Sequence, residues 1–298
     1  MAALPQAARW LVRPSAVSMS KVAFSVRGPV AGLHQQGPSR SAVVHEQALP
    51  SSQTQVPQVE RAAFLSQVET EIPRTPAAAL DETAFLDTLI SQIPLVQTLR
   101  QSRKAYQESR PHLAIPPAIR QHHFVGGSLA GPGKLALAPY MWTTRGKTEA
   151  GSKSTARASS VVSVFHIGHD LCGHPGFVHG GLLSVLFDEV FARCVSAAFP
   201  SGLGMTANLN VDFRKPALPD RLYVLRAETV KVEGRKAWVE GKMTYLPLSL
   251  SAPLDAKSLV ADAALLSEDN EGAVMVSEAR ALFVEPKFAD SMVSVYKT

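Results

Sequence analysis

Residues 177–198 constrain the fold more than any other part of the sequence, because they have the pattern of a helix that is apolar on most sides. Such a helix must be buried nearly all round. Long strand patterns precede and follow it, so we expect an α+β fold in which an antiparallel sheet wraps around one central helix. The apolar positions are Leu182, Leu183, Val185, Leu186, Phe187, Val190, Phe191, Cys194 and Val195.

Six segments have the pattern of strands. Residues 205–214 alternate between apolar and polar side chains, which places Thr206, Asn208, Asn210, Asp212 and Arg214 on one face. Gly234 is expected to form the turn of a hairpin. The predicted strands are 135–144, 161–167, 205–214, 221–232, 236–246 and 273–285.

The net charge of +5 is confined to the N-terminal end of the chain. Five cations and no acidic residue precede Glu46, and the remaining 25 Lys and Arg residues balance all 25 Asp and Glu residues. Residues 1–45 therefore have the composition of a mitochondrial targeting leader, which predicts a mitochondrial protein, in the matrix. A disordered tail with accidental charge is the alternative. The neutral body predicts no nucleic-acid partner.

Residues 46–120 are expected to form a linker, at 46–78, and a helical extension. The helical pattern runs over 81–109 with a break at Pro94, and a shorter helix is predicted at 62–68. The main domain is predicted at 121–298, with a helical insertion at about 247–272. No apolar run approaches the roughly 18 residues that suggest a transmembrane helix.

Residues 125–135 resemble a phosphate-binding loop only superficially. The required glycine is replaced by Ser128, and Leu135 stands where a hydroxyl would bind magnesium. We interpret the stretch as a turn that leads into a strand. Cys172 and Cys194 are expected to be free thiols.

The stretch HIGHDLCGHPGFVHGG raises the question of a zinc site. It contains His166, His169, Cys172, His174 and His179. These residues span a strand end, a Pro-Gly turn and a helix start, whereas zinc ligands come at fixed spacing on one hairpin or helix face. We therefore expect no metal, and interpret the first three histidines as loop residues.

Gly180, Ser184 and Asp188 form a small polar stripe along the helix. A carboxylate on a buried helix is costly unless it is paired or used. Glu189 has Arg193 four residues later as an expected partner, whereas Asp188 has no cation at that spacing, so we interpret Asp188 as functional. The unpaired amides of the first turn are suited to form an oxyanion hole.

The spacing of His179 and Asp188 constrains any shared chemistry. Nine residues of helix span about 13.5 Å, whereas reacting groups must lie about 3 Å from the substrate. If both ends of the helix act on one carbonyl, Asp188 and the Gly180 amide must come from different protomers. The sequence thus predicts a homodimer with composite sites.

The motifs HGGLLSVLFDE, TANLNVDFRKPAL and VEGRKAWVEGKM resemble those of the hotdog-fold acyl-CoA thioesterase superfamily, in its mitochondrial thioesterase-superfamily-member branch with fungal proteins of this type. The resemblance covers about residues 120–290. It implies a hotdog fold, in a dimer or a dimer of dimers. It also implies hydrolysis of an acyl-CoA, with coenzyme A as part of the substrate and no other cofactor.

Roles carried over by position follow from this resemblance. Asp188 would be the catalytic carboxylate, as nucleophile or as general base; His179 and Gly180 would form the oxyanion hole, and the Thr206 hydroxyl would assist Asp188. Further substrate contacts are expected at Gly181, Asn208, Arg214, Lys215, Arg235 and Lys236. The four cations are equally well explained as solvated charges at turns or as ligands of the coenzyme A phosphates.

Two other functions remain as alternatives. One is a non-catalytic hotdog protein that binds acyl-CoA or a protein, a function favoured if the extension or the insertion fills the site. The other is an acyl-CoA dehydratase, but its motif places a histidine five residues after the aspartate, where this chain has Arg193.

Overall fold

The structure, a computed structural model, describes residues 76–144, 159–250, 256–267 and 271–292. All of these residues belong to one of the two units into which the chain divides, Thr54–Thr298. The predicted leader at 1–45 and the predicted short helix at 62–68 lie outside the described residues. The same holds for nearly all of the predicted linker.

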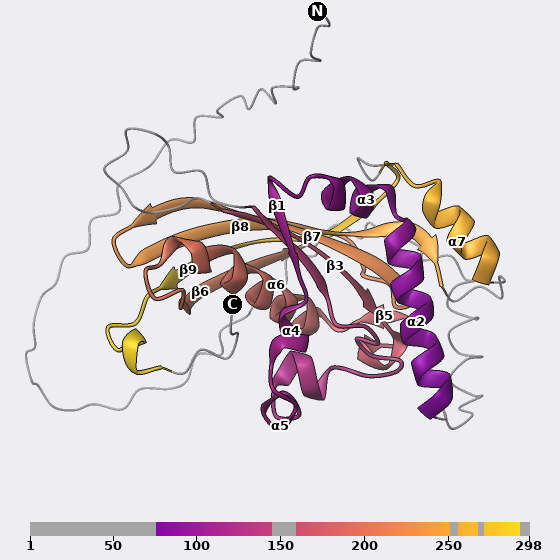
Figure 1. Cartoon of the computed structure of the whole chain (residues 1–298), viewed down its shortest axis with the longest axis horizontal. Helices are drawn as coiled ribbons and strands as arrows, with labels where there is room; N and C mark the ends of the chain where they lie inside the picture. The colour runs from indigo at the N-terminus through magenta and orange to yellow at the C-terminus, as the bar shows by residue number, and fades with distance from the viewer. Residues whose placement is uncertain (1–75, 145–158, 251–255, 268–270, 293–298) are drawn as a thin grey trace, which may run out of the picture. The chain divides into compact units, whose positions relative to one another are not determined.

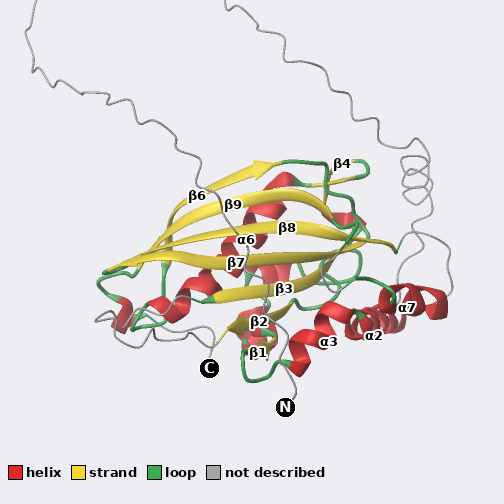
Figure 2. Cartoon of the chain, turned by 90° about the horizontal axis from the view of Figure 1, so that it is seen from above, coloured by secondary structure: helices red, strands yellow, loops and turns green. Residues whose placement is uncertain are grey.

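Seven strands form one antiparallel sheet, in the order β1-β2-β3-β7-β8-β9-β6 (Figure 2). The first and last of these are the two edges of the sheet. A separate ladder pairs β4 (Cys172–His174) with β5 (Phe177–Val178). The strands of the large sheet are β1 (Tyr106–Ser109), β2 (Tyr140–Thr144), β3 (Ser160–Ile167), β6 (Met205–Phe213), β7 (Arg221–Glu233), β8 (Lys236–Ser249) and β9 (Val274–Val284).

The central strands agree with the sequence predictions. The predicted hairpin is confirmed, because Glu233 pairs with Lys236 and Gly234 has a φ of +55°, a conformation that favours glycine. Strand β8 continues beyond the predicted end at residue 246, because its pairing with β7 extends to Ser249 opposite Arg221.

The strand predicted at 135–144 is wrong over its first half, since β2 begins only at Tyr140. The carbonyls of Ala136 and Ala138 accept hydrogen bonds from the side chains of Thr83 and Arg110, each at 3.0 Å. The preceding stretch turns as expected, with Gly131 and Gly133 at positive φ, but it leads into this irregular segment rather than directly into a strand.

The helical prediction for 81–109 is also wrong at its end. Helices α2 (Pro76–Gln92) and α3 (Pro94–Gln101) are present, with the break at Pro94. Residues Tyr106–Ser109 instead form β1, which pairs with β2 from Tyr106 opposite Thr144 to Ser109 opposite Met141. This pairing between distant segments supplies backbone hydrogen bonds that a local helical pattern does not reveal.

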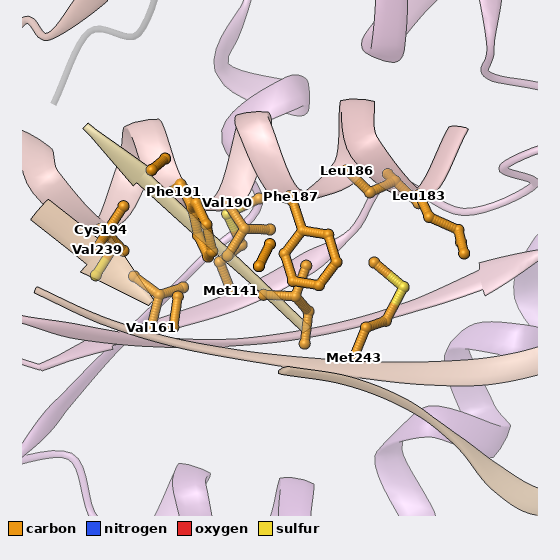
Figure 3. Close-up of a cluster of buried hydrophobic side chains, with 14 of the residues drawn as sticks. Met141, Val161, Leu183, Leu186, Phe187, Val190, Phe191, Cys194, Val239 and Met243 are labelled. Atoms are coloured by element: carbon orange, nitrogen blue, oxygen red, sulfur yellow. The ribbon is translucent and has the colours of Figure 1, made fainter. Parts of the chain in front are cut away.

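The central helix is α6 (Gly180–Val195), shorter than predicted because Phe177 and Val178 belong to β5 and residues Ser196–Ala198 form a 3-10 turn. One side of α6 packs on the inner face of the sheet. Figure 3 shows this layer of side chains, which includes Leu183, Leu186, Phe187, Val190, Phe191 and Cys194 of α6 with Met141, Val161, Val239 and Met243 of the sheet.

The opposite side of α6 is not buried as fully as expected. Gly181 is exposed, and Ser184, Val185, Asp188 and Ala192 are half-buried. In a single chain the helix is therefore covered by the sheet below and left partly open above. This open strip contains the polar stripe found in the sequence.

Helices α2, α3 and α7 (Ala256–Ala264), the last of which is the helix expected in the insertion, pack on part of the other face of the sheet, against β2, β3, β7 and β8 (Figure 1). Alternate residues along the strands point to the two faces: Val161 packs against α6, and Val162 packs in the outer cluster. The three outer helices therefore do not cover the open strip of α6. No helix in the described ranges is long and apolar enough to cross a membrane.

We expect the substitution Gly241→Ala to destabilise the fold. A methyl group at Gly241 in β8 would lie 2.6 Å from Phe191 Cε1 and 2.7 Å from the Arg226 carbonyl oxygen. The free energy of unfolding, measured with urea, should fall by about 1–3 kcal/mol. Glu240→Ala, at the exposed neighbouring position, should change it by less than about 0.5 kcal/mol. Equal effects of the two substitutions would contradict this packing.

Candidate active site

His179 caps the start of α6. Its ring Nδ1 accepts a hydrogen bond from the Gly181 N–H at 2.9 Å, and its carbonyl accepts one from the Leu182 N–H at 2.9 Å. Within the described residues, the Gly180 N–H has no hydrogen-bond acceptor. The first-turn amide left to bind an anion or a polarised carbonyl oxygen is therefore that of Gly180, and not that of Gly181.

The cap also fixes the protonation of the His179 ring. Since a backbone N–H can only donate, Nδ1 must be unprotonated, and the ring proton of neutral His179 lies on Nε2. Gly173 of β4 packs closely against this ring, because a methyl group there would lie 2.7 Å from Cδ2.

Asp188 and Thr206 lie together, as the family resemblance implies. Thr206 Oγ1 donates a hydrogen bond of 2.6 Å to Asp188 Oδ1. The bond joins the open side of α6 to the edge strand β6. It leaves the second carboxylate oxygen of the half-buried Asp188 available to accept a proton.

A β-bulge makes this contact possible and corrects the predicted alternation of β6. Thr206 pairs with Phe283 and Asn208 with Leu282, so Ala207 is an extra residue. The strict alternation placed Thr206 on the same face as Asn208, away from α6. The extra residue turns Thr206 to the face that carries α6.

The Gly180 amide lies at the other end of β6. Phe213, the last residue of this strand, covers Gly180 so closely that a methyl group on Gly180 would lie 3.4 Å from Phe213 Cζ. Thr206 and Phe213 are about 20 Å apart along the strand. Within one chain, Asp188 and the Gly180 amide are therefore too far apart to act on one carbonyl group.

Two residues expected to contact substrate lie on the outer face of the sheet. Asn208 accepts a hydrogen bond from Asn210. Arg214 forms ion pairs with Glu278 and Asp212, and its hydrogen bond to Glu278 lowers the pKa of that carboxyl group. Asp188 belongs to α6, which packs on the inner face of the sheet, so Asn208 and Arg214 lie on the opposite side of the sheet from it.

The other three cations lie at opposite ends of the sheet. Lys215 is two residues after Phe213, at the Gly180 end. Arg235 and Lys236 belong to the β7–β8 turn at the other end, where Lys236 pairs with Val284 and Val284 with Met205. Arg235 Nη1 donates a hydrogen bond of 2.8 Å to the Glu285 carbonyl.

The remaining histidines of the motif have structural contacts. His166 is a buried residue of β3 rather than a loop residue, and its Nε2 lies 3.9 Å from Asp220 Oδ1. His169 Nδ1 lies 3.2 Å from the same oxygen, and exposed His174 stacks on Phe177. Across the described residues, no three His, Cys, Asp or Glu side chains are arranged to hold a metal ion.

Neither cysteine is paired in a disulfide. Cys194 is buried in the α6 core, and Cys172 is half-buried in β4. Burial, reinforced by the nearby charge of Asp220, raises the pKa of the Cys172 thiol to about 11. Cys172 is therefore a thiol rather than a thiolate nucleophile at neutral pH.

Glu189 has a contact that the sequence did not indicate. Its Oε2 lies 3.2 Å from Nε2 of His112, a residue of α4 (Pro111–Ala114) that is only 3% exposed. The expected partner was Arg193, four residues along the helix. His112 is 77 residues away in the sequence, so no local spacing pointed to it.

The thioesterase superfamily has a sequence pattern that matches residues 175–245, which include the start of α6, Asp188 and Thr206. Over these residues the chain is similar to the thioesterase superfamily. The hotdog fold that the sequence resemblance implied, a curved antiparallel sheet around a central helix, is the fold observed.

Three curated proteins illustrate what the whole chain is similar to. It is 28% identical to MIOREX complex component 3 of Saccharomyces cerevisiae over 60% of this chain and 66% of that protein. It is 26% identical to an uncharacterised mitochondrial protein of Candida albicans over 68% of this chain and 78% of that one. It is 42% identical to the acyl-coenzyme A thioesterase THEM4 of Rattus norvegicus over 26% of this chain and 33% of that one. The chain thus spans just under two thirds of the yeast relative and a third of the rat relative.

We expect His179→Ala to loosen the start of α6. Loss of an N-cap side chain costs about 1 kcal/mol of helix stability, so the Gly181 amide should exchange its hydrogen roughly five times faster in nuclear magnetic resonance experiments. His122→Ala, at an exposed histidine remote from α6 in sequence, is the control and should leave that rate unchanged. An unchanged rate in His179→Ala would contradict the cap.

Proposed function

We propose that this protein hydrolyses acyl-CoA thioesters in a homodimer. Each of the two sites would combine Asp188 and Thr206 of one protomer with the Gly180 amide of the other. The observation that carries the proposal is the 2.6 Å hydrogen bond from Thr206 to Asp188, which orients a half-buried carboxylate on the helix matched by the family pattern.

In the proposed reaction, the Gly180 N–H stabilises the negative charge that develops on the thioester oxygen. Water attacks the carbonyl carbon as Asp188 takes its proton, the C–S bond breaks, and the thiolate of coenzyme A receives that proton. Alternatively, Asp188 attacks the carbonyl carbon directly, the C–S bond breaks and coenzyme A leaves as a thiolate, and water then opens the resulting anhydride to the free acid and Asp188. In both routes Thr206 holds one carboxylate oxygen and leaves the other free to react.

The surface around the site supports the dimer. Strand β6 is an edge, so its outer backbone groups lack a neighbouring strand within the described part of the chain. Met205 and Phe213 at its two ends are 47% and 56% exposed. Two copies of β6 paired antiparallel would place the Asp188 end of one chain beside the Gly180 end of the other, and would cover the open strip of α6.

The same pairing selects among the cations proposed for the coenzyme A phosphates. It would bring Lys215 of one protomer near Arg235 and Lys236 of the other. We therefore propose these three as phosphate ligands. Arg214 is less suited, because Glu278 and Asp212 already balance its charge on the outer face.

We further propose that the protein acts in mitochondria, in the matrix. The leader composition at 1–45 and the name of the Candida albicans relative support this localisation. A second candidate function, a non-catalytic component of a protein complex, is favoured by the name of the yeast relative. Measurement of hydrolysis distinguishes the two candidates.

We expect free-thiol release from at least one acyl-CoA in a panel of short, medium and long chains. Asp188→Asn should lower this rate at least about a hundredfold, because it removes the acid–base group. Thr206→Val should lower it about tenfold, because it removes a hydrogen bond to a charged group. Asp212→Asn, on the outer face of the same strand, is the control. No release from any acyl-CoA by folded parent protein would favour the non-catalytic function.

The composite site predicts complementation between two inactive variants. Gly180→Pro removes the amide donor at the first helical position, where proline is well tolerated, and Gly180→Ala keeps the donor and should remain active. Co-expressed Asp188→Asn and Gly180→Pro chains would form mixed dimers with one intact site. Random pairing should then restore about a quarter of the parental rate. If mixed dimers form but show no activity, the site is not shared between protomers.

A further inference from the structure

A pocket of about 350 Å³ lies between α4, α5 (Pro117–Arg120), the π-helical turn η1 (Phe124–Ser128) and the irregular segment before β2. Thr83 of α2 also contributes to it. Every residue that lines it precedes the region matched by the thioesterase pattern. Its volume is at the lower end of the range of about 300–1,000 Å³ typical of small-molecule sites.

The walls of the pocket are apolar and its charged groups are all cationic. Leu113, Val125 and Leu137 are among the apolar side chains, and no lining residue is Asp or Glu. The absence of acidic groups extends beyond the pocket, because the sequence contains no Asp or Glu between Glu108 and Glu149. The wall itself thus supplies no carboxylate, and the acidic residues that contact its members, Asp87 at Arg110 and Glu189 at His112, come from α2 and α6.

The two arginines of the pocket differ in their contacts. Arg110 is engaged by Asp87, with 3.3 Å between Nη1 and Oδ1, and by the Ala138 carbonyl. Arg120 is half-buried and forms no ion pair with another described residue. Arg120 is therefore the group whose charge a ligand would satisfy.

We propose that this pocket binds a small amphipathic anion, with its carboxylate or phosphate head at Arg120 and a short aliphatic tail against Leu113 and Val125. Leu113 is 52% exposed without a ligand, and a tail in the pocket would cover it. The site is separate from the one formed by Asp188, Thr206 and Gly180, and the proposal does not depend on thioester hydrolysis.

The pocket is connected to α6 by one hydrogen bond. His112 lines the pocket and contacts Glu189, the residue after Asp188. Its neighbour His123, whose ring centre lies 5.4 Å away, accepts a hydrogen bond from the Gly126 N–H. A ligand in the pocket would therefore be detectable at the His112 ring without any measurement of activity.

The test is calorimetric titration of the full chain with octanoate, octyl phosphate and octanol. We expect one of the two anions to bind at one site per chain, at least about ten times more tightly than octanol, because a charge-assisted hydrogen bond to arginine requires an anion. The better anion identifies the head group as carboxylate or phosphate. Equal affinity for octanol, or no binding of either anion, would overturn the proposal.

Variants locate the binding. Arg120→Gln should weaken binding of the better anion about tenfold, whereas Lys134→Gln should not, because Lys134 is a cation of the same segment that does not line the pocket and contacts Ser128. Asp188→Asn should bind normally, and the ring nitrogen signals of His112 should shift on binding to the parent. Binding lost in Asp188→Asn but kept in Arg120→Gln would assign the ligand to the thioesterase-type site and refute the pocket.

Discussion

The packing of α6 on the inner face of the sheet is the interaction on which the other features depend. Phe187 and Phe191 fill the space between helix and sheet, and the missing side chain of Gly241 lets Phe191 approach the backbone of β8. Burial of each such aromatic side chain contributes about 1.5–3 kcal/mol. Because this apolar side must face the sheet, the rotation of α6 about its axis is fixed. Asp188 therefore lies on the open strip of α6, and the first turn of the helix lies next to its cap, His179.

The chemistry of the site depends on two local irregularities added to this regular packing. The bulge at Ala207 turns Thr206 toward α6, where its hydroxyl holds Asp188. The histidine cap occupies the Gly181 amide and leaves that of Gly180 without an acceptor in the described structure. Each irregularity determines which atom is available to a substrate. Neither changes the hydrophobic core, so the fold and the site are specified by largely different residues.

The segments outside the matched family region are divided between the two faces of the sheet. Helices α2, α3 and α7 bury their apolar residues on the outer face of the sheet, the face opposite to α6 (Figure 1). Helix α4 and the turn η1 instead flank α6, where His112 contacts Glu189. The N-terminal helical extension thus packs on the outer face of the sheet through α2 and α3, and contacts α6 on the inner side through α4.

The sequence by itself determined the features that depend on local pattern. The apolar pattern of α6, the strand patterns of β3 and β9 and the glycine turn between β7 and β8 each follow from a few consecutive residues. Asp188 was identified as a carboxylate without a cation at helical spacing. Long-range hydrogen bonding decided the rest. Residues Tyr106–Ser109 form a strand because they pair with β2. The carbonyls of Ala136 and Ala138 bind side chains instead of a neighbouring strand, and Glu189 contacts His112. Only the tertiary structure shows on which face of the sheet Thr206 lies, because one bulged residue reverses the alternation of a strand. It also shows the partner of Arg214, because an ion pair between strands has no signature in sequence spacing.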